Sequence, residues 1–234
     1  MKSFEPSYEK PPISLETLAG RTYSGCGRLF AASIRLVRQR AMGSDPSNFD
    51  DLVTLERLQA IESVEAPKAV LLREAATLVP DPQAQSNLLF VVGVLMEQQR
   101  DFEAAVFFYW DALQRVPQDL TLRYFTLNNL GFSLNQLQRF EEGYFYCQEA
   151  IKVDPCKPNA HKNCGLADWG LGRLREAALC FVRATDANLK DRRSADHLQD
   201  LLRKHADLRS EFEFEMQRCL ILAAEDRRGW SSAN

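Results

Sequence analysis

Small and apolar residues recur along the middle of the chain with a fixed period. Four landmarks, Gly131, Gly143, Cys147 and Ala150, return 34 residues later as Gly165, Ala177, Phe181 and Ala184. Upstream, Gly93, Ala105, Ala112 and Pro117 precede Gly131, Gly143, Ala150 and Pro155 by a constant 38. A fixed period of this length indicates stacked copies of one supersecondary unit. The pattern therefore predicts three helical hairpins, over residues 86–119, 124–157 and 158–191, with four residues inserted between the first two.

The recurring positions have physical reasons. Counting each unit from one, position eight is always glycine (Gly93, Gly131 and Gly165), which allows the first helix to approach the second closely. Positions twenty and twenty-seven hold small residues. Proline at position thirty-two, as in Pro117 and Pro155, ends the second helix because it lacks an amide donor; the third unit has Leu189 there instead.

This unit resembles the tetratricopeptide repeat, whose pattern is W-x2-L-G-x2-Y, then A-x3-F, then A and P. The large aromatic residue at position four is absent, since Leu89, Leu127 and His161 stand there, and position eleven of the third unit is Asp168. The resemblance implies an all-α fold, a right-handed α-α superhelix of helical hairpins with flanking N- and C-terminal helices.

The flanks extend this organisation. We expect a repeat array over residues 48–191 that begins with a degenerate unit at 49–82, in which the glycine position is Glu56. Residues 1–47 form an N-terminal segment whose stretch from Arg28 to Met42 is basic and amphipathic. This pattern favours a packed helix with a solvated arginine face. The alternative is a helix that binds an anionic partner or a membrane surface. Residues 192–234 are expected to cap the array, because 192–205 and 208–225 carry helical periodicity.

Composition narrows the function. With 29 Lys plus Arg against 32 Asp plus Glu, the formal net charge is −3, which gives no field to attract nucleic acid. No apolar stretch is long enough to cross a bilayer, and the N-terminal residues do not have the pattern of a secretory signal. The six cysteines include no C-x-x-C pair. We therefore expect a cytoplasmic protein with reduced thiols, and membrane binding is disfavoured.

The resemblance also indicates where a partner would bind. In the family, helix positions on one side of each first helix line a concave groove, and the candidate residues here are Asn87, Phe90, Val94, Phe125, Asn128, Asn129, Phe132, Asn135, Lys162, Asn163, Leu166 and Trp169. Amides can donate to and accept from a peptide backbone, and the apolar groups can form pockets. The alternative is that the protein's own flanking segments cover these apolar groups.

One specific function of the family is disfavoured. Family members that clamp acidic chaperone tails need lysine, asparagine and arginine at set positions, and only Asn129 fits here. The carboxylate-clamp function is therefore not expected.

No catalytic, cofactor or metal site emerges from the spacing. Gly25-Cys26-Gly27 lacks the third glycine of a dinucleotide loop. His197 and His205 are eight residues apart without a third metal ligand, and His161 with Cys164 occupies core positions.

The sequence thus predicts a non-enzymatic protein-interaction module, an adaptor or a chaperone, that binds a partner peptide in its groove and needs no cofactor. The alternative is a structural subunit whose groove is filled by its own termini or by a fixed partner. The oligomeric state is left open.

Overall fold

The computed structural model describes residues 81–115, 118–189 and 192–231, with side chains described as far as residue 221. The N-terminal segment 1–47, its basic stretch 28–42, nearly all of the degenerate unit 49–82, and Pro117 lie outside the described residues. The chain divides into two compact units, and the boundary between Leu122 and Arg123 falls within one helix. Each unit is described by itself.

The unit that ends at Leu122 contains the hairpin of α5 (Pro82–Gln98) and α6 (Phe102–Gln114). Asp81 caps α5, because its carboxylate accepts the backbone N–H groups of Gln83 and Ala84 at 3.1 and 3.0 Å. Asp101 caps α6 by accepting the backbone N–H of Ala104 at 3.0 Å. Sequence-encoded caps therefore set the start of both helices.

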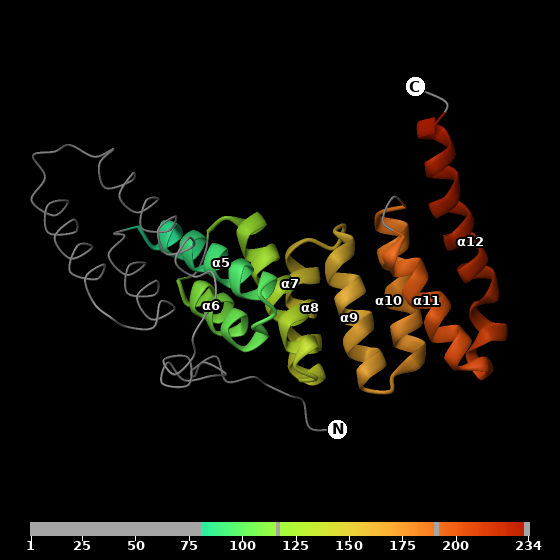
Figure 1. Cartoon of the computed structure of the whole chain (residues 1–234), viewed down its shortest axis with the longest axis horizontal. Helices are drawn as coiled ribbons and strands as arrows, with labels where there is room; N and C mark the ends of the chain where they lie inside the picture. Colours follow the sequence, from blue (N-terminus) through green and yellow to red (C-terminus); the bar gives the residue numbers. More distant parts are fainter. Residues whose placement is uncertain (1–80, 116–117, 190–191, 232–234) are drawn as a thin grey trace, which may run out of the picture. The chain divides into compact units, whose positions relative to one another are not determined.

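The unit that begins at Arg123 holds most of α7 (Leu120–Gln136) and the five helices that follow it (Figure 1): α8 (Phe140–Val153), α9 (Pro158–Gly170), α10 (Leu174–Ala187), α11 (Arg193–Lys204) and α12 (Ala206–Ser231). Each helix from α8 to α12 packs on the next one along the chain, and α12 also contacts α10. The last two helices bury Leu198, Leu201 and Phe212 in one cluster with Phe181 of α10. Both helices pack against the apolar side of α10.

The three hairpin turns share one backbone geometry. Each contains a residue with a positive φ at the same place in the unit: Arg100 (61°), Gln138 (60°) and Gly172 (74°). The following residue donates its backbone N–H to the carbonyl five residues earlier, from Asp101 to Met96, from Arg139 to Leu134 and from Arg173 to Asp168. This is the bonding of a Schellman helix end. The repeat seen in the sequence is thus also a repeat of backbone conformation.

The glycines at position eight bring the two helices of each hairpin together. A Cβ added at Gly93 would lie 2.6 Å from the ring of Tyr109, and one added at Gly165 would lie 2.7 Å from the ring of Phe181. At Gly131 it would lie 2.5 Å from the sulfur of Cys147. The bulky residue at position twenty-four therefore fills the space that glycine leaves open.

The described residues form helices and no strand, which confirms the all-α repeat fold predicted from the sequence. None of the helices in this part of the chain is both long enough and apolar enough to pass through a bilayer.

Candidate partner-binding site

A chain of asparagine side chains joins α7 to α9. Asn163 donates its Nδ2 to the Oδ1 of Asn128 at 3.0 Å, and Asn128 donates its own Nδ2 to the Oδ1 of Asn129 at 3.0 Å. Further along α7, the Nδ2 of Asn135 donates to the backbone carbonyl of Asn163 at 2.8 Å. Buried polar groups that bond to one another in this way fix the distance between two helices.

The repeat pattern explains why these amides meet. Asn128 and Asn135 are seven residues apart and so lie on one stripe of α7, two turns from each other. Room for Asn135 comes from Gly143 on α8, since a Cβ there would collide with the Asn135 Oδ1. The small residue that the sequence requires at position twenty therefore accommodates an amide in this repeat.

A second contact fixes the start of the same two helices. The hydroxyl oxygen of Tyr124 on α7 accepts the backbone N–H of Ala160 on α9 at 3.2 Å. Burial raises the pKa of Tyr124 to about 12, so this phenol stays neutral over the physiological range. Tyr124 was not among the residues singled out from the sequence, because position one of the unit has no recurrent residue type.

Of the twelve groove candidates, the structure buries the amides of Asn128, Asn135 and Asn163, which are 5%, 6% and 3% exposed, and it buries most of Lys162. The partly exposed candidates on α7 and α9 are Asn129, Phe132, Leu166 and Trp169, and Phe125 is 37% exposed. The buried amides thus lie beneath a surface made of the partly exposed residues, of which Leu166 and Trp169 also pack against the buried cluster of α10, α11 and α12. We call this surface, made of Phe125, Asn129, Phe132, Leu166 and Trp169, the α7/α9 face.

Positive groups lie beside the aromatic rings of this face. The Nζ of Lys157 lies 4.6 Å from the ring centroids of both Tyr124 and Phe125, and the Nζ of Lys204 lies 4.9 Å from that of Trp169. A cation at such a distance is attracted by the ring. Both lysines also pair with a carboxylate, with Asp154 at 3.6 Å and Asp200 at 2.8 Å respectively. The face therefore does not carry a net positive field.

The remaining candidates, Asn87, Phe90 and Val94, belong to the other compact unit and lie partly exposed on α5. The ring of Phe90 packs against that of Tyr109 with centroids 5.8 Å apart.

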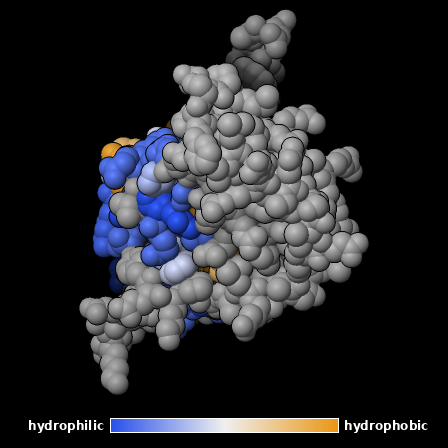
Figure 2. Space-filling model, turned by 90° about the vertical axis from the view of Figure 1, so that its left-hand side faces the viewer, coloured by the Kyte–Doolittle hydropathy of each residue, from blue (hydrophilic) through white to orange (hydrophobic). Residues whose placement is uncertain are grey.

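On the side of the molecule that Figure 2 shows, the described residues form no broad apolar patch that would mark a partner site by itself. On the side of the molecule shown in Figure 2, the coloured residues are mostly hydrophilic, and hydrophobic colour is confined to small spots. Large exposed apolar residues of the described segments are scattered: Val91, Leu120, Phe125, Leu179, Leu189, Phe214 and Ile221. The α7/α9 face is therefore distinguished by its arrangement and not by the size of an apolar area.

A pocket of about 520 Å³ lies between α11 and α12 and is lined by Asp200, Arg203 and Met216 among others. Its charged groups pair with neighbours, since Asp200 contacts Arg203 at 2.5 Å and Arg209 contacts Glu213 at 3.1 Å. It offers no nucleophile with an adjacent base.

The histidines singled out from the sequence have separate surroundings. His197 stacks on Phe181 with centroids 5.4 Å apart, and burial, followed by the nearby charge of Lys162, lowers its pKa. His205 ends α11 as its C-cap. His161 lies within hydrogen-bond distance of the Pro155 carbonyl, 2.8 Å from its Nε2.

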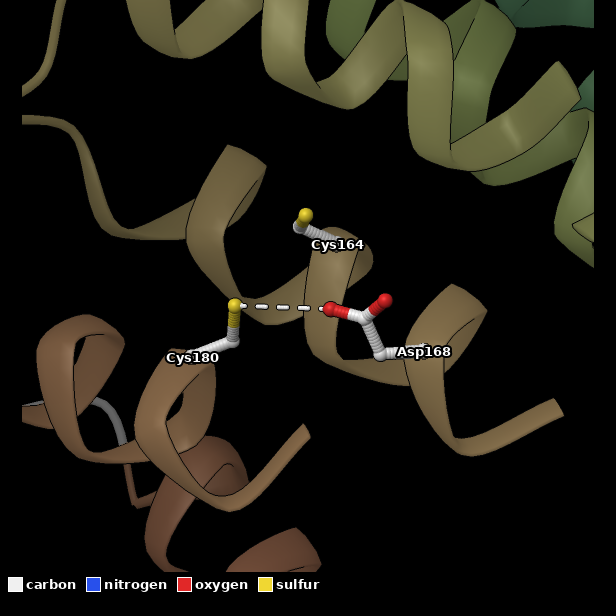
Figure 3. Close-up of side chains that lie close together, drawn as sticks. All are labelled: Cys164, Asp168 and Cys180. Atoms are coloured by element: carbon white, nitrogen blue, oxygen red, sulfur yellow. Dashed lines mark hydrogen bonds between the residues drawn. The ribbon is translucent and has the colours of Figure 1, made fainter. Parts of the chain in front are cut away.

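Between α9 and α10 lies a buried cluster of two thiols and a carboxylate, Cys164, Asp168 and Cys180 (Figure 3). Burial raises the pKa of Asp168 to about 6, although Arg173, 3.5 Å away, favours the charged form. A hydrogen bond between the thiols of Cys164 and Cys180, together with burial, raises the pKa of Cys164. The repeat pattern predicts a core position for Cys164 and marks Asp168 as a departure from the family pattern, but it gives no signal that connects Cys180 with them.

No protein-family model matches the chain, and no curated protein matches its sequence. Several solved structures are similar. A fragment of MamA from Desulfovibrio magneticus RS-1, from residue 41 to its end, aligns with a TM-score of 0.55 at 16% identity, covering 87% of this chain and 98% of that one. BtubC from P. vanneervenii aligns with a TM-score of 0.56 at 18% identity, covering 89% and 93%.

A TPR domain of Arabidopsis OM64 aligns with a TM-score of 0.48 at 22% identity, covering 53% of this chain and 98% of that one. Identities this low bear on the fold alone. The three hairpins repeat the same glycine contact and the same turn geometry, and their arrangement is similar to that of MamA and BtubC. We conclude that the chain has the fold of tetratricopeptide-repeat proteins.

Proposed function

We propose that the protein is an interaction module of the adaptor or chaperone type, and that its α7/α9 face binds an extended segment of a partner protein. The observation that carries this proposal is the bond between the buried Asn163 and Asn128, which ties α7 to α9 beneath the face. Asn128 in turn bonds to Asn129 on the face. A buried polar chain is not needed to pack two helices, because apolar residues would do so at lower desolvation cost. Its presence fits a face that must keep a set geometry.

A preset geometry favours binding, because less conformational freedom is lost when the partner binds. The contacts between Tyr124 and Ala160 and between Asn135 and Asn163 fix α7 against α9 at both ends of the asparagine chain. A segment lying along these helices would therefore meet a surface that is already ordered.

The chemistry of the face indicates the kind of segment. Asn129 offers an amide suited to a peptide backbone, while Phe125 and Phe132 offer aromatic surface for one or two apolar side chains. Because Lys157 and Lys204 are paired with carboxylates, we do not expect a strongly acidic segment. We propose that Asn87, Phe90 and Val94 of α5 form a face of the same kind in their own unit.

Photo-crosslinking tests the proposal. A photoreactive amino acid is placed at position 129 on the α7/α9 face and, as a matched control, at position 179 on α10, where Leu179 is 41% exposed. We expect position 129 to crosslink one partner segment and position 179 not to do so. A synthetic peptide with the sequence of that segment should then bind the purified protein.

Two results would reject the proposal. Equal crosslinking from both positions would show that capture is nonspecific. Crosslinks from position 129 only to the protein's own chain would favour the structural subunit whose groove is filled by its own termini.

A further inference from the structure

The buried cluster between α9 and α10 brings together three side chains of the kinds that ligate metals. One ligand atom each from Cys164, Asp168 and Cys180 lies within 4.8 Å of the other two, and all three residues are buried. In Figure 3 the carboxylate of Asp168 points toward the sulfur of Cys180, and Cys164 lies one helical turn before Asp168 on the same face of α9. Helix spacing and hairpin packing thus place all three donors at one point.

The same three positions are apolar in the other hairpins. Cys164, Asp168 and Cys180 occupy positions seven, eleven and twenty-three of their unit, and the equivalent residues are Val92, Met96 and Phe108 in the first unit and Leu130, Leu134 and Tyr146 in the second. All six equivalents are buried. The fold therefore needs a buried side chain at these positions but does not need a polar one, so packing alone does not explain the three ligand types.

The carboxylate is poorly satisfied as it stands. Asp168 is 2% exposed, and within the described part of the chain its Oδ1 accepts no hydrogen bond of good geometry, although it pairs with Arg173. Its Oδ2 accepts from the Cys180 thiol at the long distance of 3.9 Å. The guanidinium of Arg173 approaches no closer than 3.5 Å. A buried carboxylate whose only close cation lies at this distance is stabilised further when a second cation binds to it directly.

We propose that Cys164, Asp168 and Cys180 bind a zinc ion. Thiolate sulfur selects zinc over calcium and magnesium, and a carboxylate ligand suits divalent zinc better than monovalent copper. Binding releases the two thiol protons. The two charges of zinc and that of Arg173 then balance the two thiolates and the carboxylate, which leaves a neutral buried site.

The geometry is close to what zinc requires. With zinc–sulfur bonds of about 2.3 Å and zinc–oxygen bonds of about 2.0–2.2 Å, donors in a tetrahedron lie roughly 3.5–4 Å apart. The observed limit of 4.8 Å is larger than this spacing, so binding requires the three side chains to rotate toward one another. A water molecule would take the fourth position, which leaves the charge balance unchanged.

Cobalt titration of the purified, chelator-treated full-length protein tests the proposal, because Co²⁺ bound by thiolates shows a sulfur-to-metal charge-transfer band. We expect this band to saturate at one equivalent and to disappear when one equivalent of Zn²⁺ is added. Zinc should also raise the melting temperature of the protein, since it binds the folded state.

Substitutions then locate the site. Cys164→Val and Cys180→Ser should abolish the band, and Asp168→Asn should weaken Co²⁺ binding by at least about tenfold. Cys156→Ser, at an exposed thiol, and Cys219→Ser, at a buried thiol of another cluster, should leave the band unchanged. Circular dichroism shows whether each variant has folded.

The wild-type titration alone can overturn the proposal, whatever the folding of the variants. A folded wild-type protein that shows no charge-transfer band at one equivalent of Co²⁺ would reject a zinc site. A band that persists in folded Cys164→Val and is lost in Cys156→Ser would place the metal elsewhere and would equally reject it.

Discussion

Between the two helices of hairpin α5/α6 lie Val92, Met96 and Phe108, whereas the same positions of hairpin α9/α10 hold Cys164, Asp168 and Cys180. The two hairpins nevertheless share their architecture. Each has a glycine facing a large ring and a turn residue with a positive φ. The fold therefore constrains the residue size at position eight and the backbone conformation at position fifteen. The side chains at positions seven, eleven and twenty-three need only be buried. The latter positions are where a repeat can acquire chemistry without losing its shape.

The largest effect is expected at the shared glycine. Gly93→Ala and Gly165→Ala should each lower the free energy of unfolding by about 2–3 kcal/mol, because the added Cβ would meet the ring of Tyr109 or Phe181 at 2.6 or 2.7 Å. Urea unfolding followed by circular dichroism measures this. The matched controls are Val91→Ala and Leu179→Ala, at exposed positions of the same hairpins, which should change stability by less than about 0.5 kcal/mol. Similar values for glycine and control variants would show that the close approach is not required.

Asp168→Leu gives position eleven of the third unit the residue type that the second unit has there, as Leu134. In metal-free protein at neutral pH we expect it to raise the free energy of unfolding by about 2 kcal/mol, because a poorly satisfied buried carboxylate is replaced by an apolar side chain. Arg173 is 36% exposed and can be hydrated once its partner is gone. Differential scanning calorimetry in the presence of a chelator provides the measurement. A destabilised variant would mean that the ion pair outweighs the cost of burying the carboxylate.

The turn residue distinguishes the two hairpins by sequence but not by conformation. Gly172→Gln introduces the residue type of the second turn and should lower the free energy of unfolding by about 1–2 kcal/mol. A side chain disfavours a φ of +74°, and no atom lies within 4 Å of the added Cβ to make a compensating contact. Arg100→Gly should not destabilise the α5/α6 turn, since glycine adopts a positive φ freely. Thermal unfolding of both variants tests the pair, and a loss of stability in Arg100→Gly with none in Gly172→Gln would contradict the shared geometry.

The smallest effect concerns a hydroxyl that only hairpin α5/α6 possesses. Tyr109 donates to the Oε2 of Glu97 at 2.9 Å, whereas Phe181 stands at the same position of α9/α10. Tyr109→Phe should lower the free energy of unfolding by about 1 kcal/mol. Chemical denaturation at neutral pH resolves a change of this size, and an unchanged midpoint would show that water replaces the bond at no cost.

The sequence was sufficient to predict the hairpins, because the glycine at position eight recurs as a residue type in all three units. It did not reveal the positive φ at position fifteen, since Arg100 and Gln138 carry side chains there and only Gly172 gives a clue. The helix period placed Asn128 and Asn135 on one side of their helix, and the family resemblance added Asn163 to the groove candidates. Neither could show that they bond to one another, because that depends on the distance between α7 and α9. The position of Cys180 beside Asp168 likewise depends on how α10 packs on α9.

The most direct test of the proposed function is the affinity for the peptide identified by crosslinking, measured by fluorescence anisotropy. We expect Phe132→Ala to weaken binding by about tenfold or more, equivalent to about 1.4 kcal/mol. Leu179→Ala on α10 and Asp168→Leu inside hairpin α9/α10 should leave the affinity within about twofold, since neither residue lies on the α7/α9 face. An unchanged affinity in a folded Phe132→Ala variant, or an equal loss in all three variants, would contradict binding at this face.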